Sequence, residues 1–257
     1  MTPSYNQAKY VGRTIDSVLG QRGVEVNYLV QDGNSEDGTV DVLIDYGSRL
    51  NWRSVADEGQ ADAINNGFAD LPGDIMGWLN SDDVLMPNAL ARVAEVFARH
   101  PDIDVIYGNR IYIDNIGNDV GRCVLPQHDV EAIKWCDFIP QETMFWRRGV
   151  WEATGGLRRD FQFALDWDFI LRAGSFGFRF HHLPVFLGCF RVHDAQKTSR
   201  MAARGEQEMQ RLRTEHLGFT PDYRVIAKAA APYMRRQILV DAVNRVCRQL
   251  VRVPGFS

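Results

Sequence analysis

Acidic side chains follow three predicted β-strands of this chain, at the points where the strands end. Asp32, Asp57 and the pair Asp82-Asp83 each come directly after a run that is typical of a strand. In open α/β sheets, ligands bind at the carboxyl ends of the strands. Carboxylates that converge there repel one another unless a positive group binds between them. Their oxygen atoms suit Mg²⁺ or Mn²⁺, which keep waters and substrate phosphates as ligands. The pattern therefore predicts a divalent-cation site at this edge of the sheet.

Each acidic group also has a simpler local explanation. Residues 32–35 have the sequence DGNS, and these residue types form turns for local reasons. Asp82 and Asp83 could instead favour the start of the helix expected after Pro87, because carboxylates stabilise the positive end of a helix dipole. Since all of these acidic groups would lie on one sheet edge, we favour a shared binding site over separate local roles.

The elements that must position these residues alternate along the first 125 residues. Strand-like runs followed by helical runs are typical of βα units around a mostly parallel sheet. Residues 124–156 are predicted to be irregular and to line a substrate site. Their aromatic residues Trp135, Phe145, Trp146 and Trp151 fit either a sugar-stacking wall or plain core. The expected elements are strands at 26–30, 51–55, 74–79 and 104–113, helices at 39–50, 87–100 and 166–173, and strands within 178–190.

Length and composition fit one α/β domain with an appendage. The chain has 257 residues, of which 45% are apolar, and a formal net charge of −4. A chain of this length can bury a sizeable core, and its mild acidity argues against a dedicated nucleic-acid binder. No apolar run approaches the roughly 20 residues that span a bilayer. The four cysteines form no CxxC pair and are expected to be reduced thiols in a cytoplasmic protein.

The charge is divided unevenly along the chain. Residues 200–257 hold 11 basic and 5 acidic side chains, whereas residues 1–199 hold 18 basic and 28 acidic ones. We therefore predict a catalytic domain over 1–200 and a basic helical extension over 201–257. Such an amphipathic helix can rest on an anionic membrane surface, or its apolar face can pack on the domain. Its apolar face would hold Leu239, Ala242, Val243, Val246 and Leu250, with Arg245, Arg248 and Arg252 opposite.

Several motifs, in order and spacing, resemble the inverting family 2 glycosyltransferases of GT-A fold. The motifs are TPSYNQ at 2–7, DGNSEDGT at 32–39, DEGQADAINNG at 57–67 and NSDD at 80–83, followed by PQE at 140–142, FWRR at 145–148, DWD at 166–168 and FRVH at 190–193. The resemblance covers residues 1 to about 200. It implies a Rossmann-like, mostly parallel central sheet flanked by helices, with the C-terminal helical extension outside it.

The resemblance also implies how the donor is bound. Pro3 and Tyr5 would line the nucleotide base, and Asp32 would accept a hydrogen bond from it. Asp57 would lie beside the nucleoside. Asp82 matches the last acid of the family's Asp-x-Asp element, which holds the metal on the sugar-nucleotide diphosphate. A UDP-sugar is the weakly preferred donor.

The remaining roles concern the metal and the reaction. By resemblance, Mn²⁺ or Mg²⁺ would be held by Asp82, with Asp83 and His193 as further contacts. Asp166 matches the general base, and Asp168 follows it on the same segment. In an inverting transfer the base takes the proton of the acceptor hydroxyl, which typically contributes ~10²–10⁴-fold. The metal acts as a Lewis acid on the leaving diphosphate. Asp166 and Asp168 could alternatively cap a helix, and His193 could be a surface hydrogen-bonding group.

The sequence departs from the family pattern at three places. Asn80 stands where the first acid of the Asp-x-Asp element is expected, and Leu165 stands where many members have Glu. Members normally begin with an apolar strand before the Thr-Pro-Ser-Tyr-Asn segment, and here Met1 takes its place. We therefore expect that the first strand is missing and that the true start lies upstream, because a missing central strand leaves backbone groups unpaired.

The motifs lead to one main hypothesis and two alternatives. The main hypothesis is a metal-dependent inverting glycosyltransferase that acts on a glycan or lipid-linked acceptor, in the cytoplasm or peripherally on the inner face of the membrane. The first alternative is a catalytically silent sugar-nucleotide or glycan binding module, which Asn80 keeps open. The second is a sugar nucleotidyltransferase, which would be expected to show a Gly-rich, Arg/Lys-bearing loop near the N-terminus, and the sequence has none.

Overall fold

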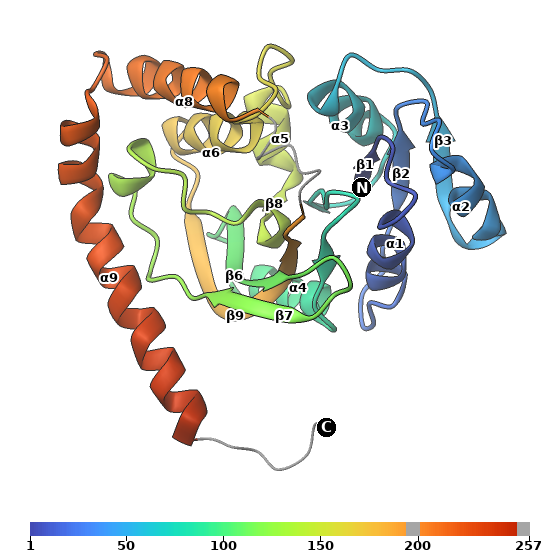
Figure 1. Cartoon of the computed structure of the whole chain (residues 1–257), viewed down its shortest axis with the longest axis horizontal. Helices are drawn as coiled ribbons and strands as arrows, with labels where there is room; N and C mark the ends of the chain where they lie inside the picture. Colours follow the sequence, from blue (N-terminus) through green and yellow to red (C-terminus); the bar gives the residue numbers. More distant parts are fainter. Residues whose placement is uncertain (194–200, 251–257) are drawn as a thin grey trace.

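The structure is a computed structural model that describes residues 1–193 and 201–250, with side chains described up to Val246 (Figure 1). The side chains of Arg248, Leu250 and Arg252, which belong to the predicted amphipathic helix, lie outside this part. Within the described residues, no helix is long and apolar enough to cross a membrane.

The N-terminal third is a three-stranded parallel sheet with the order β1-β2-β3. Its helices pack by their apolar faces, as α1 does with Val11, Ile15 and Val18, which recur at helical spacing and are buried. The strands are β1 (Thr2–Ser4), β2 (Leu29–Asp32) and β3 (Asn51–Ser54), and the helices are α1 (Val11–Leu19), α2 (Thr39–Asp45) and α3 (Gln60–Ala69), with a 3₁₀ turn η1 (Gly47–Arg49). The predicted strand at 26–30 starts later than expected, because the ladder pairs only Leu29 to Asp32 with β3.

The second sheet is mixed. It runs in the order β4-β8-β6-β9-β5, with β7 on the side of β6. Only β6 and β9 pair in parallel, and the other pairs are antiparallel. The predicted α/β class is confirmed, with the parallel part of the sheet concentrated in the first half. The strands are β4 (Ile75–Met76), β5 (Val84–Leu85), β6 (Val105–Ile113), β7 (Asp119–Cys123), β8 (Phe145–Arg147) and β9 (Phe180–Arg191).

Helices cover the second sheet and fill the region predicted to be irregular. Residues 124–156 contain the short strand β8 and the helix α5 in addition to two 3₁₀ turns, so the prediction of wholly irregular structure there was wrong. The elements are α4 (Ala89–Arg99), η2 (Ala132–Lys134), η3 (Gln141–Thr143), α5 (Arg148–Thr154) and α6 (Leu165–Ser175).

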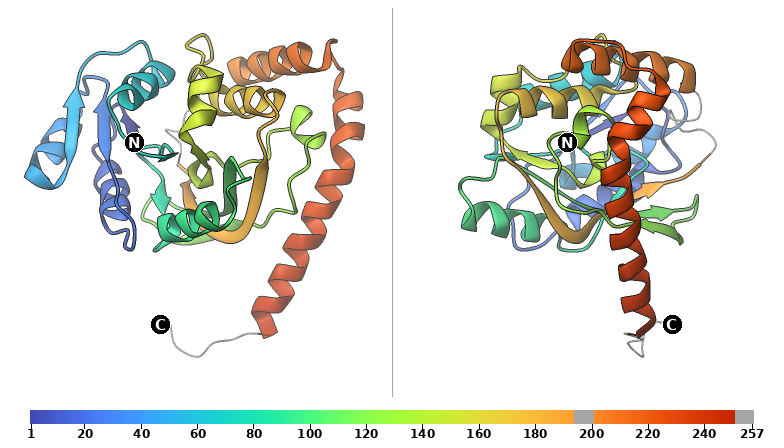
Figure 2. Two further views of the ribbon diagram at one scale, coloured as in Figure 1. Left: turned by 180° about the vertical axis from the view of Figure 1, so that it is seen from behind. Right: turned by 90° about the vertical axis from the view of Figure 1, so that its left-hand side faces the viewer.

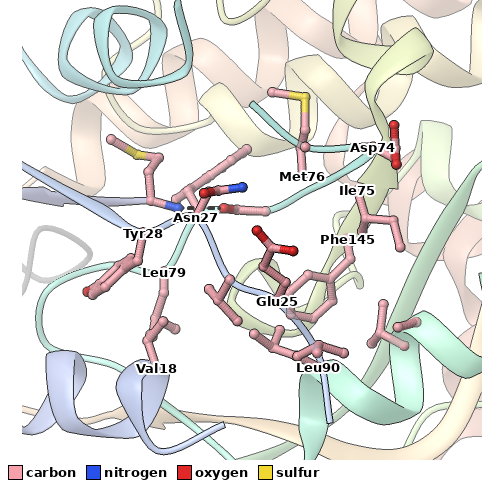
Figure 3. Close-up of a pocket in the computed structure, with 18 of the residues that line it drawn as sticks. Val18, Glu25, Asn27, Tyr28, Asp74, Ile75, Met76, Leu79, Leu90 and Phe145 are labelled. Atoms are coloured by element: carbon pink, nitrogen blue, oxygen red, sulfur yellow. Dashed lines mark hydrogen bonds between the residues drawn. The ribbon is translucent and has the colours of Figure 1, made fainter. Parts of the chain in front are cut away.

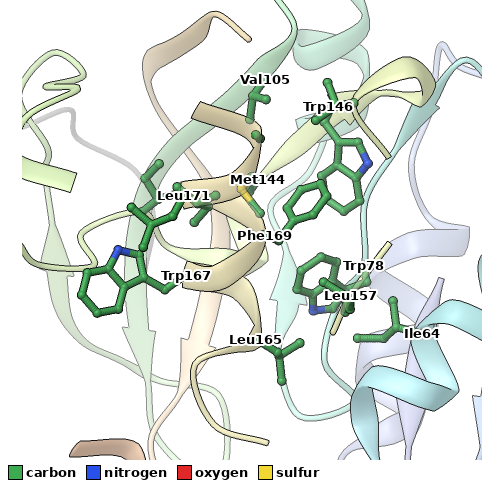
Figure 4. Packing of buried hydrophobic residues seen from close by; sticks show 14 of the residues in the cluster. Ile64, Trp78, Val105, Met144, Trp146, Leu157, Leu165, Trp167, Phe169 and Leu171 are labelled. Carbon is green, nitrogen blue, oxygen red and sulfur yellow. The ribbon is translucent and has the colours of Figure 1, made fainter. Parts of the chain in front are cut away.

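Aromatic side chains form the centre of the core (Figure 4). Trp146 is fully buried, its ring packs edge-on against Trp78, and Trp151 stacks on it at 6.0 Å between ring centroids. Burial of such large rings is worth several kcal/mol each. Trp146 and Trp151 are therefore core residues, and the alternative of a sugar-stacking wall is wrong for them. Cys123, Cys136 and Cys189 are free thiols, as expected.

The two sheets meet at Met1. Its amino group donates to Gly77 O at 2.9 Å, and Leu79 N donates to Met1 O at 3.0 Å. Beside the amino group lies a cavity of about 450 Å³ (Figure 3). It is bounded on one side by residues 24–28 and on the other by residues 72–79. Burial lowers the pKa of the Met1 amino group to about 5.

Two further helices, α8 (Ala202–Leu217) and α9 (Tyr223–Leu250), follow the second sheet. α8 lies next to α6 and buries Leu212 in the core (Figure 1). α9 runs down the side of the body and is anchored by Tyr233, whose ring stacks on Phe138 at 4.0 Å. Its second half reaches beyond the body (Figure 2). Leu239, Val243 and Val246 are exposed there, so the alternative that this apolar face packs on the domain is wrong.

Candidate functional site

The carboxyl end of β2 is tied to its neighbours by Asp32. The Asp32 side chain is fully buried, and it accepts hydrogen bonds from Ser35 Oγ at 2.5 Å, Ser35 N at 2.9 Å and Ser54 Oγ at 2.6 Å. These bonds close the turn after β2 and join it to the end of β3. Asp32 thus performs the local turn role, and it lies at the sheet edge where the sequence predicts a nucleotide.

Asp57 lies against the same turn. A Cβ atom at Gly33 would lie 2.7 Å from Asp57 Oδ2, so only glycine admits this approach. Asp57 Oδ1 accepts a hydrogen bond from Gly59 N at 2.9 Å. Burial raises the pKa of Asp57, and the neighbouring charges of Asp62 and Asp32 raise it further. The structure therefore brings Asp32 and Asp57 together, as their positions after adjacent parallel strands predict.

The loop after β1 presents Tyr5. Pro3 is buried within the strand, whereas the Tyr5 side chain is 63% exposed at the edge of the sheet. Asn6 has a left-handed backbone conformation (φ 53°), and its backbone N–H donates to Ser35 Oγ at 2.8 Å. This contact fixes the Tyr5 loop against the turn that follows Asp32. Pro3, Tyr5, Asp32 and Asp57 thus converge on one edge of the first sheet.

Asp82 pairs with His193. Asp82 Oδ2 lies 3.0 Å from His193 Nε2, and the Tyr10 ring packs beside the imidazole at 4.8 Å between centroids. Thr14 Oγ1 of α1 donates to the carbonyl of Ser81 at 2.9 Å and so fixes the loop that carries Asp82. Asp82 remains partly exposed (19% of its side chain), whereas His193 is almost completely buried.

Asp83 points away from this pair. It is 1% exposed, and its Oδ1 accepts a hydrogen bond from Arg191 N at 3.0 Å. Burial raises the pKa of Asp83 well above its ordinary value, and the charges of Asp82 and Glu142 add to the effect. The predicted metal trio is therefore divided: the structure brings Asp82 and His193 together and turns Asp83 to the other side of the loop.

Asp82 and His193 are the residues here that could hold a divalent cation. They share a hydrogen bond of 3.0 Å, and two ligands on adjacent corners of an octahedron, each about 2.1 Å from a metal, would lie at a similar separation of about 3 Å. Within the described residues, no group of three or more His, Cys, Asp and Glu side chains surrounds one point. A cation there would thus take its remaining ligands from substrate phosphates and water, as Mg²⁺ commonly does.

A cavity of about 660 Å³ opens next to the Asp82 loop. The cavity is lined at one point by Asn80 and Asp83, which flank Ser81 and Asp82 in the sequence. It is lined at another point by Asp166. Gln60 Nε2 donates to Asn80 Oδ1 at 2.8 Å and so orients this side chain at the wall. The aromatic residues that line the cavity are Trp78, Tyr112, Phe138, Phe163, Trp167 and Phe190.

Asp166 and Asp168 occupy the first turn of α6 but have different surroundings. Asp166 is partly exposed in the cavity, and its Oδ1 accepts a hydrogen bond from Trp167 N at 2.9 Å. Asp168 is fully buried and forms ion pairs with Arg158 at 3.2 Å and Arg172 at 2.7 Å. Asp168 therefore stabilises the packing of α6, and of the two only Asp166 faces the cavity.

Sequence reasoning did not identify Asp137 as a cavity residue. Asp137 lines the cavity and is exposed. Desolvation by the cavity walls raises the pKa of Asp137 above its ordinary value, and the nearby charge of Asp166 raises it further. Asp137 lies in a segment without periodic pattern, so no sequence signal indicated it.

Arg110 and Glu142 form a buried ion pair in the cavity wall. Arg110 Nε and Nη2 donate to the two Glu142 oxygens at 2.7 and 2.6 Å, and the guanidinium lies over the Phe190 ring at 4.5 Å. The two charges cancel, and the other carboxyl groups of the lining are those of Asp83, Asp137 and Asp166. A charged residue in the middle of the apolar strand β6 was the available sequence signal for Arg110.

Comparison with known proteins gives consistent results. A family model described as "Glycosyl transferase family 2" matches residues 1–161. An uncharacterized glycosyltransferase of Nostoc sp. is 30% identical over 166 residues, which cover 58% of this chain and 50% of the relative. The chain thus spans about half the length of that relative. A PGL/p-HBAD biosynthesis glycosyltransferase of Mycobacterium tuberculosis is 28% identical over 178 residues, which cover 67% of this chain and 68% of the relative.

Solved structures share the fold at low sequence identity. S. aureus TarS 1-349 in complex with UDP-GlcNAc has a TM-score of 0.67 at 17% identity, over 95% of this chain and 73% of TarS. A mannosyltransferase of Pyrobaculum calidifontis in complex with GDP-Man and Mn²⁺ has a TM-score of 0.57 at 20% identity, over 84% of this chain and 60% of that one.

Proposed function

Since this chain belongs to glycosyl transferase family 2 and has the GT-A fold, we propose that it transfers a sugar, with inversion, from a nucleotide-diphosphate donor to an acceptor hydroxyl. The observation that carries this proposal is the shared cavity. Its wall holds Asn80 and Asp83 next to Asp82, and it also holds Asp166. The Asp83 and Asp166 carboxyl groups thus face one space, and Asp82, our candidate metal ligand, is the neighbour of Asp83 on the same loop.

We assign the donor nucleotide to the edge of the first sheet. The exposed Tyr5 ring offers a stacking surface for the base, and Asp57 offers a carboxylate beside the nucleoside. Pro3 and Asp32 support these two groups from within the sheet. A UDP-sugar is our preferred donor, and the likeness to TarS with bound UDP-GlcNAc supports this preference.

A divalent cation would be held by Asp82 and His193, with Asp83 behind the same loop. Bound there, Mn²⁺ or Mg²⁺ supplies Lewis-acid stabilisation to the departing diphosphate. Asp82 and His193 fix its position, and the Tyr10 ring shields one side of the imidazole from water. The Pyrobaculum mannosyltransferase of similar fold is in complex with GDP-Man and Mn²⁺, which supports the use of a divalent cation.

Asp166 is our candidate for the general base. Its carboxylate lies in the first turn of α6, where the helix dipole favours the charged form. A carboxylate that is ionised and exposed to the cavity can accept the proton of an acceptor hydroxyl. Desolvation and the nearby charge of Asp166 raise the pKa of Asp137, which favours its protonated form as a hydrogen-bond donor to the acceptor.

We further propose a lipid-linked acceptor at the inner face of the membrane. Met234 of α9 lines the cavity and is also exposed. From it, an exposed apolar band continues along α9 through Ile238, Leu239, Val243 and Val246. Arg235, Arg236 and Arg245 accompany this band, as expected for a helix at an anionic lipid surface. An acceptor with a lipid tail could thus reach the cavity while its tail stays near the membrane.

Nucleotide release in the presence of Mn²⁺ and a panel of nucleotide sugars tests this function. The transferase proposal predicts release that requires an acceptor and that Asp82→Ala abolishes. The alternative is a silent binding module, which Asn80 favours because it stands in place of the first acid of the Asp-x-Asp element. It predicts donor binding without turnover for every acceptor in the panel.

A further inference from the structure

A carboxylate of α8 holds the loop that leads into α6. Glu208 Oε2 accepts hydrogen bonds from the backbone amides of Phe163 at 2.8 Å and Ala164 at 3.0 Å, and Glu208 Oε1 accepts one from Gln162 at 3.0 Å. The Glu208 side chain is only 8% exposed. One carboxylate thus binds three consecutive amides and fixes the backbone that they belong to.

The ionic state of Glu208 suits this role. Burial by itself would raise the pKa of Glu208, but the hydrogen bonds from Arg204 and from the three amides outweigh it and lower the pKa below its ordinary value. Arg204 Nε donates to Oε1 at 2.8 Å from one helical turn away. Glu208 is therefore a charged acceptor at neutral pH, and hydrogen bonds to a charged group are about twice as strong as neutral ones.

α8 also touches this loop through Gly205. A Cβ atom at Gly205 would lie 2.8 Å from the Phe163 ring, so the glycine lets the helix approach closely. Glu208 thus binds the backbone of the loop, and α8 contacts the Phe163 side chain of the loop at Gly205. Both contacts come from residues outside the part of the chain that the family model matches.

The loop that Glu208 binds, residues 162–164, leads directly to Asp166. The N-cap residue of α6 is Ala164, which has no side chain that could cap the helix. Asp166 follows two residues later, and Phe163, Ala164 and Asp166 all line the same cavity. Displacing the loop therefore moves the Asp166 carboxylate relative to anything bound there.

We propose that Glu208 is a positioning residue for Asp166, so that the C-terminal helices form part of the catalytic apparatus. This inference rests on the proposed function of Asp166 as the base. A misplacement of about 1 Å can cost as much as 10²-fold in rate, so a small loop shift is enough to be measured. Donor binding at the other end of the site does not depend on this loop.

The test compares two substitutions on α8. Glu208→Gln keeps the side-chain size but removes the charge and one of the two good acceptors. We expect kcat for transfer to fall by about 10-fold or more, with the donor KM within twofold. Glu215→Gln is the matched control, because among the described residues Glu215, on the same helix, accepts from the Arg158 and Arg211 side chains and from no backbone amide. It should keep kcat within twofold.

Gly205→Ala provides a second, independent test that leaves Glu208 in place. Its methyl group pushes on Phe163, and we expect kcat to fall again with donor KM unchanged. Amide hydrogen exchange at residues 162–164 should become faster in Glu208→Gln. Wild-type kcat in both variants, or a parallel change of kcat and donor KM with a loss of cooperative melting, overturns the proposal. If Asp166→Asn abolishes turnover but Glu208→Gln preserves it, this inference alone is wrong. If the unmodified protein shows no turnover, the proposed function is wrong as well.

Discussion

Asp82 Oδ2 and His193 Nε2 lie 3.0 Å apart, although 111 positions separate the two residues in the sequence. The contact joins the loop between β4 and β5 to the residues just after the end of β9. Arg191, two residues before His193, supports it by donating to the Asp82 carbonyl at 2.8 Å. The end of the strand and the loop thus bring one oxygen and one nitrogen atom to the same point.

The first prediction concerns metal binding at this pair. Asp82→Asn and His193→Gln should each weaken Mn²⁺ binding in the presence of UDP by at least about 10-fold, since even the loss of outer partners of a metal site has this effect. Titration calorimetry measures it. Asp119→Asn, which removes an exposed carboxylate on β7, is the control. Unchanged Mn²⁺ affinity in His193→Gln would exclude this histidine as a ligand.

The pairing of Asp82 with His193 marks the limit of what the sequence predicts about the site. Asp32 and Asp57 could be assigned to one edge because parallel strands end on the same side of a sheet. The prediction that Asp82 lies on that same edge was wrong, because Asp82 follows β4, a strand of the second sheet. The separation of Asp83 from Asp82 could not be predicted, because it depends on a hydrogen bond from the distant Arg191.

Two further residues at or near the site, Asp137 and Glu208, could not be predicted from the sequence for similar reasons. Asp137 lies in an aperiodic segment, and Glu208 acts on backbone amides 44 to 46 positions away. Neither position has a local pattern that indicates its partner. The strands and helices of the fold were easier to predict, because periodicity is a local property, and β6 begins within one residue of its predicted start and ends at the predicted residue.

The second prediction concerns the pH dependence of stability. Burial lowers the pKa of His128 and of His182 to about 4, and at His182 the neighbouring histidines add to the effect. Both are neutral in the folded protein, while in the unfolded chain they take up protons below about pH 6.5. The unfolded state therefore binds more protons between pH 6.5 and 4, and the free energy of unfolding falls as the pH falls through this window, by about 3 kcal/mol per histidine at most.

Urea unfolding at pH 7 and pH 4.5 checks this sign. His182→Gln should lose less stability on acidification than the unmodified protein. The exposed His100 offers a matched control, and His100→Gln should keep the full slope. Equal slopes in all three proteins would show that the buried histidine does not contribute.

The third prediction concerns the cavity beside Met1. Residues joined to the Met1 amino group would continue β1 between residues 26–28 and 75–77 and would remove a buried amine. Each large apolar side chain buried there stabilises the fold by roughly 2 kcal/mol. An extension of five strand-forming apolar residues should therefore raise the melting temperature by several degrees. A Gly/Ser extension of equal length is the control, and equal melting temperatures for the two would contradict the expectation.

The fourth prediction concerns α9 and membranes. Replacing Ile238, Leu239 and Val243 together by Ser should abolish pelleting with vesicles that contain anionic lipid, because these exposed side chains form the apolar band. Catalytic activity on a water-soluble acceptor should be retained. Zwitterionic vesicles should bind the unmodified protein only weakly. Strong pelleting of the triple variant would show that another surface binds the lipid.

The proposed transfer reaction depends most directly on Asp166. Asp166→Asn keeps the shape of the side chain but removes its ability to accept a proton. The decisive measurement is kcat for transfer together with the donor dissociation constant, both determined on this variant. The account predicts that kcat falls by ~10²–10⁴-fold, the usual contribution of a positioned base, while donor affinity stays within twofold. A variant that keeps kcat within about threefold, or that loses donor binding instead, would contradict it.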